Sequence, residues 1–195
     1  AIDVDPAGRN LYVADLGNRR VRKIDLKSGV ITTIAGNGEK GVPQDGADAA
    51  ASPLADPRAV AADSKGNVYI LERGGNALRV VERKGKIRTL IAPAKSASGS
   101  AATVVPDLNG PKHLCVDRSD NVIIADAENN LVRKYDPKTG KTVTIAGTGQ
   151  PGTEIVTGEP LKTQVHRPHG VFVHPSGALY ISDSYNHRIL KLTGW

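Results

Sequence analysis

The chain has 195 residues, of which 39% are hydrophobic and 24% charged, and its formal net charge is +6. This length is enough for one domain with a core of its own, and the hydrophobic content excludes a disordered chain. No stretch of about 18 apolar residues is present, which excludes a membrane-spanning helix, and a single cysteine excludes an intramolecular disulfide.

That cysteine, Cys115, lies in the apolar run His113-Leu114-Cys115-Val116. We expect a buried structural thiol there rather than a nucleophile. The positive net charge is compatible with nucleic acid, an anionic glycan or an acidic peptide as a partner, or with a soluble surface rich in lysine. Because the basic residues are spread through the chain, charge alone selects no partner.

One unit recurs along the whole chain. It begins with Asp15-Leu16-Gly17-Asn18 and returns at Glu72, Asp126 and Asp183, roughly 55 residues apart. Self-similarity at a near-fixed period indicates a repeat architecture. We expect repeats at about residues 1–35, 58–92, 112–146 and 169–195, forming one domain or a fragment of one.

Each repeat is predicted to form four short antiparallel strands. In the third repeat these are residues 112–117, 121–126, 131–136 and 141–146, joined by turns rich in Gly, Asn, Asp and Ser. The second strands, such as residues 122–125, are apolar on both faces, so both faces must be covered. The third strands carry Arg22, Arg79 and Arg133 at equivalent positions, and we expect these arginines to point outward.

Four-stranded antiparallel sheets that repeat and pack face to face make a β-propeller, so the predicted fold class is all-β. Another kind of solenoid is the alternative, and the turn spacing excludes helical repeats. The connections at residues 36–56, 93–110 and 147–167 are long and rich in Gly, Ala, Ser, Thr and Pro, and residues 95–102 are expected to be mobile.

Three sequence phrases are typical of one family of propellers. They are Asp183-Ser184-Tyr185-Asn186-His187-Arg188-Ile189 with its relatives at Asp15 and Asp126, Pro168-His169-Gly170-Val171, and Ile34-Ala35-Gly36-Asn37-Gly38, which returns at Ile145. On these phrases the chain resembles the NHL-repeat β-propellers, and with Asp45-Gly46 it resembles their bacterial branch.

The resemblance implies a closed ring, usually of six blades, which at this repeat length needs roughly 330 residues. Four repeats are visible, and the last one lacks its outer strand. We therefore expect part of a longer chain, whose open blade edges favour self-association. The alternative is a closed ring of four blades, in which another segment supplies the missing strand or the last blade keeps three. The resemblance also favours a secreted or periplasmic location.

In a propeller, the innermost strands of all blades begin around one mouth of the central channel. The residues that follow the recurring proline there are Arg58, Lys112 and His169, and His113 comes directly after Lys112. These four side chains are predicted to attract an anion such as a carboxylate or a phosphate. The alternative is that they are solvated charges at loop ends.

No catalytic residue, metal or cofactor is predicted. The amidating lyases resemble NHL propellers with zinc on histidines of several Pro-His motifs, but here only Pro168-His169 matches, and Arg58 and Lys112 stand at the corresponding positions. No Gly-x-Ser-x-Gly motif is present. The recurring acidic residues at Asp15, Glu72, Asp126 and Asp183 are expected to cap turns rather than to act as bases.

The resulting hypothesis is a non-catalytic binding or scaffold propeller that engages a protein, a peptide or a glycan through its loops and channel mouth. One alternative is an enzyme, a lyase or hydrolase, whose site is completed by further blades. Another is single-stranded RNA binding on a basic face. Tyr185 and His187 are predicted to be exposed contacts, whereas Tyr12, Tyr69 and Tyr180 are expected to be buried.

Overall fold

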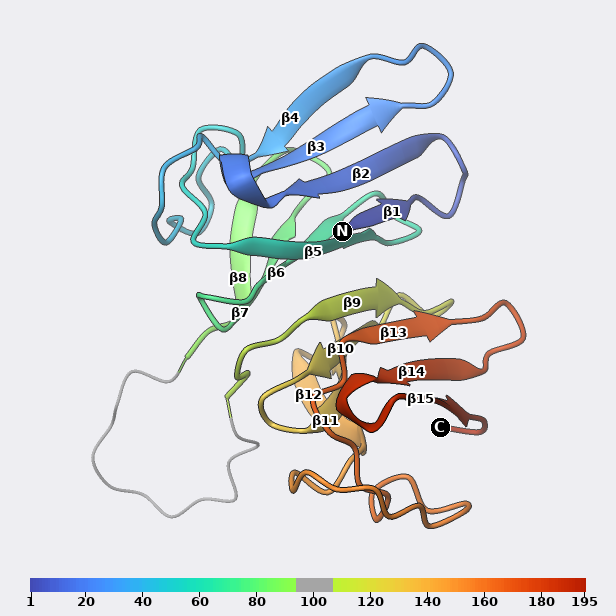
Figure 1. Cartoon of the computed structure of the whole chain (residues 1–195). Coiled ribbons are helices and arrows are strands. Elements are labelled where there is room, and N and C mark those ends of the chain that lie inside the picture. The colour runs from blue at the N-terminus through green and yellow to red at the C-terminus, as the bar shows by residue number, and fades with distance from the viewer. Residues whose placement is uncertain (94–106) are drawn as a thin grey trace.

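The computed structural model describes residues 1–93 and 107–195 and folds them into four antiparallel sheets that stack face to face (Figure 1). Each sheet, called a blade from here on, is formed by strands that follow one another in the sequence. The stack confirms the predicted all-β propeller fold. Residues 95–102, which are expected to be mobile, lie outside the described residues.

The described residues form three four-stranded blades and one three-stranded blade. Blade one contains β1 (Ile2–Val4), β2 (Asn10–Asp15), β3 (Arg20–Asp25) and β4 (Ile31–Ala35), and blade two contains β5 (Pro57–Ala62), β6 (Val68–Glu72), β7 (Ala77–Val81) and β8 (Ile87–Ile91). Blade three contains β9 (His113–Val116), β10 (Val122–Asp126), β11 (Leu131–Asp136) and β12 (Lys141–Ala146), and blade four contains β13 (Gly170–Val173), β14 (Leu179–Asp183) and β15 (Arg188–Leu192). The helices of this part of the chain are the single turns η1 (Leu16–Asn18) and η2 (Ser184–Asn186), and none is long and apolar enough to cross a membrane.

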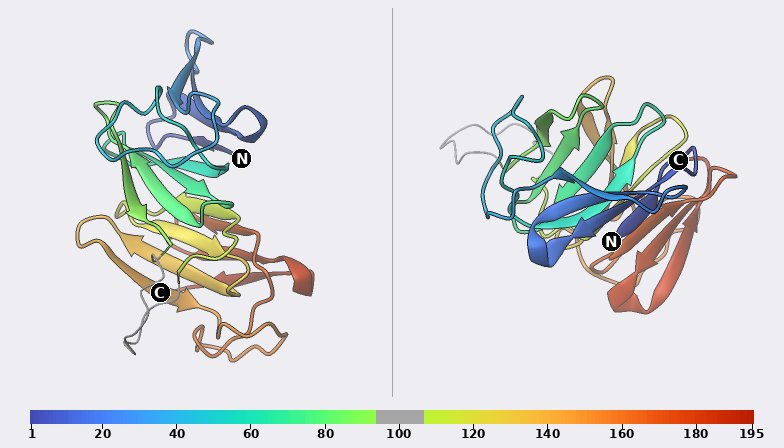
Figure 2. Two further views of the ribbon diagram at one scale, coloured as in Figure 1. Left: turned by 90° about the vertical axis from the view of Figure 1, so that its left-hand side faces the viewer. Right: turned by 90° about the horizontal axis from the view of Figure 1, so that it is seen from above.

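The first strand of each blade is the innermost one, and β1, β5, β9 and β13 pack against one another in that order. Figure 2 shows the four blades in succession, each turned relative to the one before. Because the strands are antiparallel, one end of the stack gathers the long connections and the turns between second and third strands. We call it the connection end. The opposite, hairpin end gathers the turns that join first to second and third to fourth strands.

Each pair of neighbouring blades encloses an apolar core. Tyr12 of blade one packs in a cluster with Val60 and Ile70 of blade two, and two further clusters fill the spaces between blades two and three and between blades three and four. The strands β6 and β10 are buried along their whole length, as their solid apolar sequence predicts. Tyr180, predicted to be buried, is only half-buried, because it lies on the face of blade four that no other described blade covers.

The arginines of the third strands do not all point outward, so that prediction is wrong for blades two and three. Arg79 and Arg133 are among the largest fully buried side chains of the protein. Arg79 Nε lies 2.5 Å from Glu72 Oε2, and Arg133 Nε lies 2.6 Å from Asp126 Oδ2. A buried guanidinium requires such a partner, because an unpaired charge in the interior is very costly.

The recurring acidic residue does more than cap a turn. Asp126 accepts hydrogen bonds from the backbone N–H of Asn109 (2.8 Å) and from Asn129 Nδ2 (2.9 Å), besides its ion pair with Arg133. One carboxylate therefore joins the incoming connection, the turn and the third strand of the blade. Asp183 makes three contacts of the same kind in blade four, with His166 N–H, Asn186 Nδ2 and Arg188 Nε, although Arg188 lies two positions earlier in its strand than Arg133 does.

Blade two uses a different pair of residues for the same purpose. Glu72 stands in place of the aspartate, and Gly75 stands where the other turns have asparagine. A Cβ atom at Gly75 would lie 3.2 Å from Glu72 Oε2, so the longer carboxylate fills the space that the asparagine side chain takes elsewhere. Glu72 still accepts the backbone N–H of Ala55 from the incoming connection, at 2.6 Å.

Candidate functional site

The connection end brings three of the four predicted mouth residues within electrostatic reach of one another. Arg58 is exposed on β5, and Lys112 and His169 come just before β9 and β13. Burial lowers the pKa of Lys112, and the nearby charges of Arg73 and Arg58 lower it further. The pKa of His169 is lowered first by burial and then by Lys112, Arg167 and Arg58. The space between these side chains is therefore strongly positive.

His113 is not influenced by these cations and lies deeper, on the inner strand β9. Burial is the main cause that lowers its pKa, and the N-terminal ammonium group lowers it further. Its hydrogen-bond partner is the backbone of Val171 on the neighbouring strand β13, and its Nδ1 atom is buried without a partner in the described part of the chain. A neutral imidazole packed between inner strands contributes no charge to the mouth.

Three further residues complete the charged group at the connection end. Glu128 accepts a short hydrogen bond from Arg167 Nη2, and its carboxylate also lies 3.7 Å from Arg73 Nη2. Arg167 is the first cause of the lowered pKa of Glu128, and Lys112 and Arg73 add to it. We call Arg58, Arg73, Lys112, Glu128 and Arg167 the basic cluster. Three of its cations, Arg73, Lys112 and Arg167, act on the internal carboxylate of Glu128, and Arg58 acts on Lys112.

Tyr185 and two histidines extend the basic cluster toward blade four. Arg167 donates a hydrogen bond from Nη1 to the Tyr185 hydroxyl at 3.1 Å, and its guanidinium carbon lies 4.9 Å from the centre of that ring. The rings of His166 and His169 lie 5.1 and 5.7 Å from the Tyr185 ring, centre to centre. Tyr185 is exposed, as predicted. It offers a planar surface beside the positive charge.

His187 is exposed, as predicted, but it does not join this group. It lines a shallow hollow of about 380 Å³ with Ser182, Ser184 and Ile189, on the free side of blade four. The structure thus separates the two predicted exposed contacts. Tyr185 belongs to the basic cluster, and His187 belongs to the uncovered blade face.

The backbone of Arg167 has an unusual conformation for a residue with a side chain. Its φ angle is +46°, in the left-handed region that favours glycine, and Gly110 holds the equivalent position before the proline of blade three with φ of +52°. A left-handed conformation costs about 1–2 kcal/mol for a residue with a Cβ. The Arg167 N–H is fixed by Asn130 Oδ1 at 3.0 Å. Asn76 Oδ1 holds the Gly110 N–H in the same way, at 2.8 Å, so the left-handed conformation belongs to the connection in both blades.

The sequence contains a signal for the residues that were not predicted. Comparing the second position after each recurring acidic residue gives Gly17, Gly74, Glu128 and Tyr185. Blades one and two have glycine there, and blades three and four have the two side chains that contact Arg167. Arg167 itself comes before its proline, whereas the predicted mouth residues all come after theirs.

The class of protein follows from this architecture. Antiparallel blades that repeat along the chain and pack face to face form a β-propeller, and here the connections at one end of the blades build a charged surface. A family profile described as the Teneurin NHL domain matches residues 1–194, and the chain belongs to this family. The predicted NHL-repeat membership is thereby confirmed.

Curated relatives are much longer than this chain. It is 27% identical over 204 residues to "Protein SUPPRESSOR OF QUENCHING 1, chloroplastic" of Arabidopsis thaliana, covering 93% of this chain and 18% of the relative. It is 27% identical over 216 residues to Teneurin-1 of Gallus gallus, covering 97% of this chain and 8% of the relative. The chain thus spans less than a fifth of either relative.

Solved propellers share the fold at low identity. A nidogen/laminin complex matches with a TM-score of 0.66 and 16% identity, over 98% of this chain and 59% of the matched chain. Virginiamycin B lyase from Staphylococcus aureus matches with a TM-score of 0.60 and 14% identity, over 99% of this chain and 51% of that one. A gluconolactonase from Xanthomonas campestris matches with a TM-score of 0.65 and 16% identity, over 98% and 56%. These likenesses show the fold, which supports a binding or scaffold module and also occurs in enzymes.

Proposed function

We propose that this chain is a non-catalytic binding module that holds an acidic segment of a partner protein over the basic cluster. The observation that carries the proposal is the pairing of Arg167 and Arg73 with Glu128, with the further cations Lys112 and Arg58 beside them. Arginine suits this role because its planar guanidinium pairs with a carboxylate through two parallel hydrogen bonds. The Nη1 of Arg167 already engages Tyr185, which orients the group.

Glu128 acts in this proposal as an internal stand-in for the ligand. It is held by Arg167 and Arg73 when no partner is present, and a carboxylate of the partner competes with it for the same donors. Lys112 and Arg58 have no ion pair with a carboxylate in the described part of the chain, so they are the first cations that an incoming acidic segment meets. The likeness to a propeller from a nidogen/laminin complex is in line with a protein partner.

A fluorescein-labelled peptide of alternating glutamate and glycine tests the proposal by anisotropy. We expect saturable binding that weakens about ten-fold or more when Lys112 and Arg167 are changed to Gln, because charge-assisted hydrogen bonds are lost. Glu128→Gln is expected to strengthen binding, because it removes the internal competitor and a negative charge. Lys27→Gln with Lys40→Gln, two exposed lysines of the blade-one side, is the matched control for charge.

Three outcomes would overturn the proposal. Equal weakening by the control pair would assign the binding to net charge. Tighter binding of a uridine oligonucleotide than of the peptide would favour the RNA alternative. Turnover of an ester, lactone or lyase substrate that disappears in His169→Ala would favour an enzyme.

No group of three potential metal-binding His, Cys, Asp or Glu side chains occurs among residues 1–93 and 107–195.

A further inference from the structure

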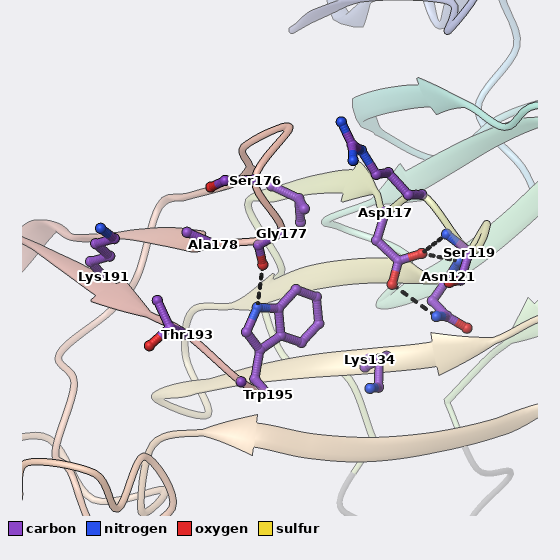
Figure 3. A pocket seen from close by; sticks show the side chains of 13 residues that line it. Asp117, Ser119, Asn121, Lys134, Ser176, Gly177, Ala178, Lys191, Thr193 and Trp195 are labelled. Carbon is purple, nitrogen blue, oxygen red and sulfur yellow. Dashed lines mark hydrogen bonds between the residues drawn. The ribbon is translucent and has the colours of Figure 1, made fainter.

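A second hollow lies at the hairpin end, away from the basic cluster, between blades three and four (Figure 3). Its volume is about 660 Å³, within the range of small-molecule binding sites. It is formed by the turn after β9, by β11, by the turn after β13 and by the residues that follow β15. We call it the Trp195 groove, after the indole at its centre.

The groove is lined by three cations and one side-chain carboxylate. Lys134, Lys191 and Arg118 line it, and none of them forms an ion pair within the described part of the chain. Asp117 is the carboxylate among the described lining residues, and its two oxygens accept hydrogen bonds from the turn that they close. The donors are Ser119 N–H, Asn121 N–H and Asn121 Nδ2, each at 2.8 Å (Figure 3). The groove therefore favours an anion.

Trp195 forms a fixed wall of the groove. Its indole N–H donates to the carbonyl oxygen of Gly177 at 3.0 Å, as Figure 3 shows. Lys134 Nζ lies 5.2 Å from the ring centre, and the ring also packs against the core between blades three and four. The Lys134 ammonium group and core side chains therefore occupy part of the surface of the ring.

The remaining lining residues are neutral hydrogen-bonding groups and small apolar ones. The Thr193 hydroxyl and Asn121 Oδ1 can serve sugar hydroxyl groups, whereas Asn121 Nδ2 is occupied by Asp117. The Ser176 hydroxyl lies 2.9 Å from His174 Nδ1, and its oxygen can still accept a hydrogen bond. Val173 and Ala178 are small and form no deep pocket for a peptide side chain. Cations together with hydroxyl and amide groups match a charged sugar better than a peptide or a base.

A related groove occurs between blades two and three, also at the hairpin end. It measures about 400 Å³, and its charged lining residues are Asp63, Lys65, Glu82, Arg83, Lys84, Arg88 and Lys138. The cations outnumber the carboxylates there, although Arg88 pairs with Glu82 and Lys65 pairs with Asp120. In the repeat, Lys138 stands where Trp195 stands in the larger groove, so two adjacent blade interfaces offer basic grooves. A linear anion with repeated charges is the ligand that such a series fits.

We propose that the Trp195 groove binds an anionic saccharide, a unit of a glycan that carries sulfate or carboxylate groups. Lys134, Lys191 and Arg118 hold the anionic substituents, and Asn121, Ser176 and Thr193 hold the ring hydroxyls. This site is independent of the function proposed for the basic cluster, since the two surfaces lie at opposite ends of the blades.

Trp195 is the single tryptophan of the chain, so its fluorescence reports on this groove directly. A fully sulfated heparin hexasaccharide is expected to change that fluorescence in a saturable way. Lys134→Ala combined with Lys191→Ala is expected to weaken binding about ten-fold or more, because two charged donors are lost. Lys134→Arg combined with Lys191→Arg is expected to retain it, and Lys27→Ala with Lys40→Ala, which removes equal charge elsewhere, is expected to change it less than about two-fold.

Two further arms separate the sources of charge and the classes of ligand. A desulfated hexasaccharide that keeps its carboxylates is expected to bind as tightly if the groove reads carboxylate, and more weakly if it reads sulfate. A uridine oligonucleotide or polyglutamate that binds as tightly and with the same dependence on Lys134 and Lys191 would overturn the proposal. A hexasaccharide that leaves Trp195 fluorescence unchanged, or that the control pair affects equally, would overturn it too.

Discussion

Asp126 and Arg133 form an ion pair whose side chains are almost wholly excluded from solvent, whereas the equivalent pair of Asp15 and Arg22 remains 25% and 27% exposed. The same two residue types therefore have different energetic weight in two blades. An exposed pair is screened by water and contributes little. A buried pair contributes most when it is intact, because removal of one member leaves the other charged and desolvated.

Asp126→Asn is accordingly expected to lower the free energy of unfolding by about 3 kcal/mol. The amide still accepts the Asn109 N–H, but Arg133 loses its charged partner, and its Nη2 atom is already buried without a hydrogen-bond partner among residues 1–93 and 107–195. Urea unfolding followed by circular dichroism measures the loss. Asp15→Asn is the control, with an expected loss below about 1 kcal/mol. Equal losses in the two variants would contradict the difference in burial.

His113 gives the protein a pH dependence of stability. Burial and the N-terminal ammonium group lower its pKa from the ordinary value of 6.5, against the opposing hydrogen bond to the Val171 backbone. The unfolded chain thus takes up a proton near pH 6.5 and the folded chain only at lower pH, so the unfolded state binds more protons in that interval. Stability is expected to fall as the pH is lowered through 6.5.

Urea unfolding at several pH values between about 7.5 and 5 tests this expectation. His113→Gln is expected to reduce the dependence, whatever its effect on stability at neutral pH. The part that remains is expected to come from His169, whose pKa is also lowered by burial. The exposed His187→Gln variant is expected to keep the dependence of the parent chain. If His187→Gln flattened the curve as much as His113→Gln, the buried imidazole would not be its source.

At the scale of the element, the turn between second and third strands is the part of the blade that varies in a coordinated way. Blade two combines a longer carboxylate, Glu72, with the absence of a side chain at Gly75, and the two substitutions fill one space. Residues that share a space in this way are expected to be coupled energetically. Blades three and four place Glu128 and Tyr185 in the same turn, and there the turn serves the basic cluster.

A double-mutant cycle in blade two measures that coupling. Gly75→Asn alone brings a Cβ atom to 3.2 Å from Glu72 Oε2, and Glu72→Asp alone leaves a gap and weakens the pair with Arg79. Each single variant is expected to be destabilised. The double variant recreates the aspartate–asparagine pair of the other blades and is expected to recover about 1 kcal/mol or more relative to the sum of the two. Simple additivity in urea unfolding would contradict the shared space.

The strands were predictable from the sequence because their signals are local. Apolar second strands, glycine-rich and asparagine-rich turns and the repeat period determine β6, β10 and their neighbours without knowledge of tertiary contacts. The burial of Arg79 and Arg133 was not predictable in the same way. A charged residue in a strand of mixed polarity is expected to be exposed, and these two are buried because each pairs with a carboxylate on the neighbouring strand. The basic cluster was predictable only in part. Arg58 and Lys112, and His169 beside the cluster, follow the repeat. Arg167 was not predictable in this way, because its position depends on the contact of its backbone with Asn130 and of its side chain with Glu128.

At the scale of the whole molecule, the two terminal blades each expose a face that the inner blades bury. Phe172 and Ile189 of blade four are 56% and 64% exposed, whereas Ala61 and Leu78, at the equivalent positions of blade two, are 1% and 0% exposed. Blade one presents Ile2 and Val4 on its own uncovered face. Exposed apolar residues gathered on one sheet face mark an association surface.

The 195-residue chain is therefore expected to self-associate through these faces at micromolar concentration and above, in analytical ultracentrifugation. The faces are complementary in kind, since blade four presents the positions that contact a following blade and blade one presents those that contact a preceding blade. Head-to-tail contact of that type repeats the interface that blades one to four already make with one another.

Phe172→Asp with Ile189→Asp is expected to shift the distribution toward monomer, because it places charge in the contact. Val42→Asp with Val143→Asp changes exposed valines outside these faces and is expected to leave the distribution unaltered. A monomer at all concentrations, or equal dissociation by the valine pair, would show that the exposed faces do not drive association.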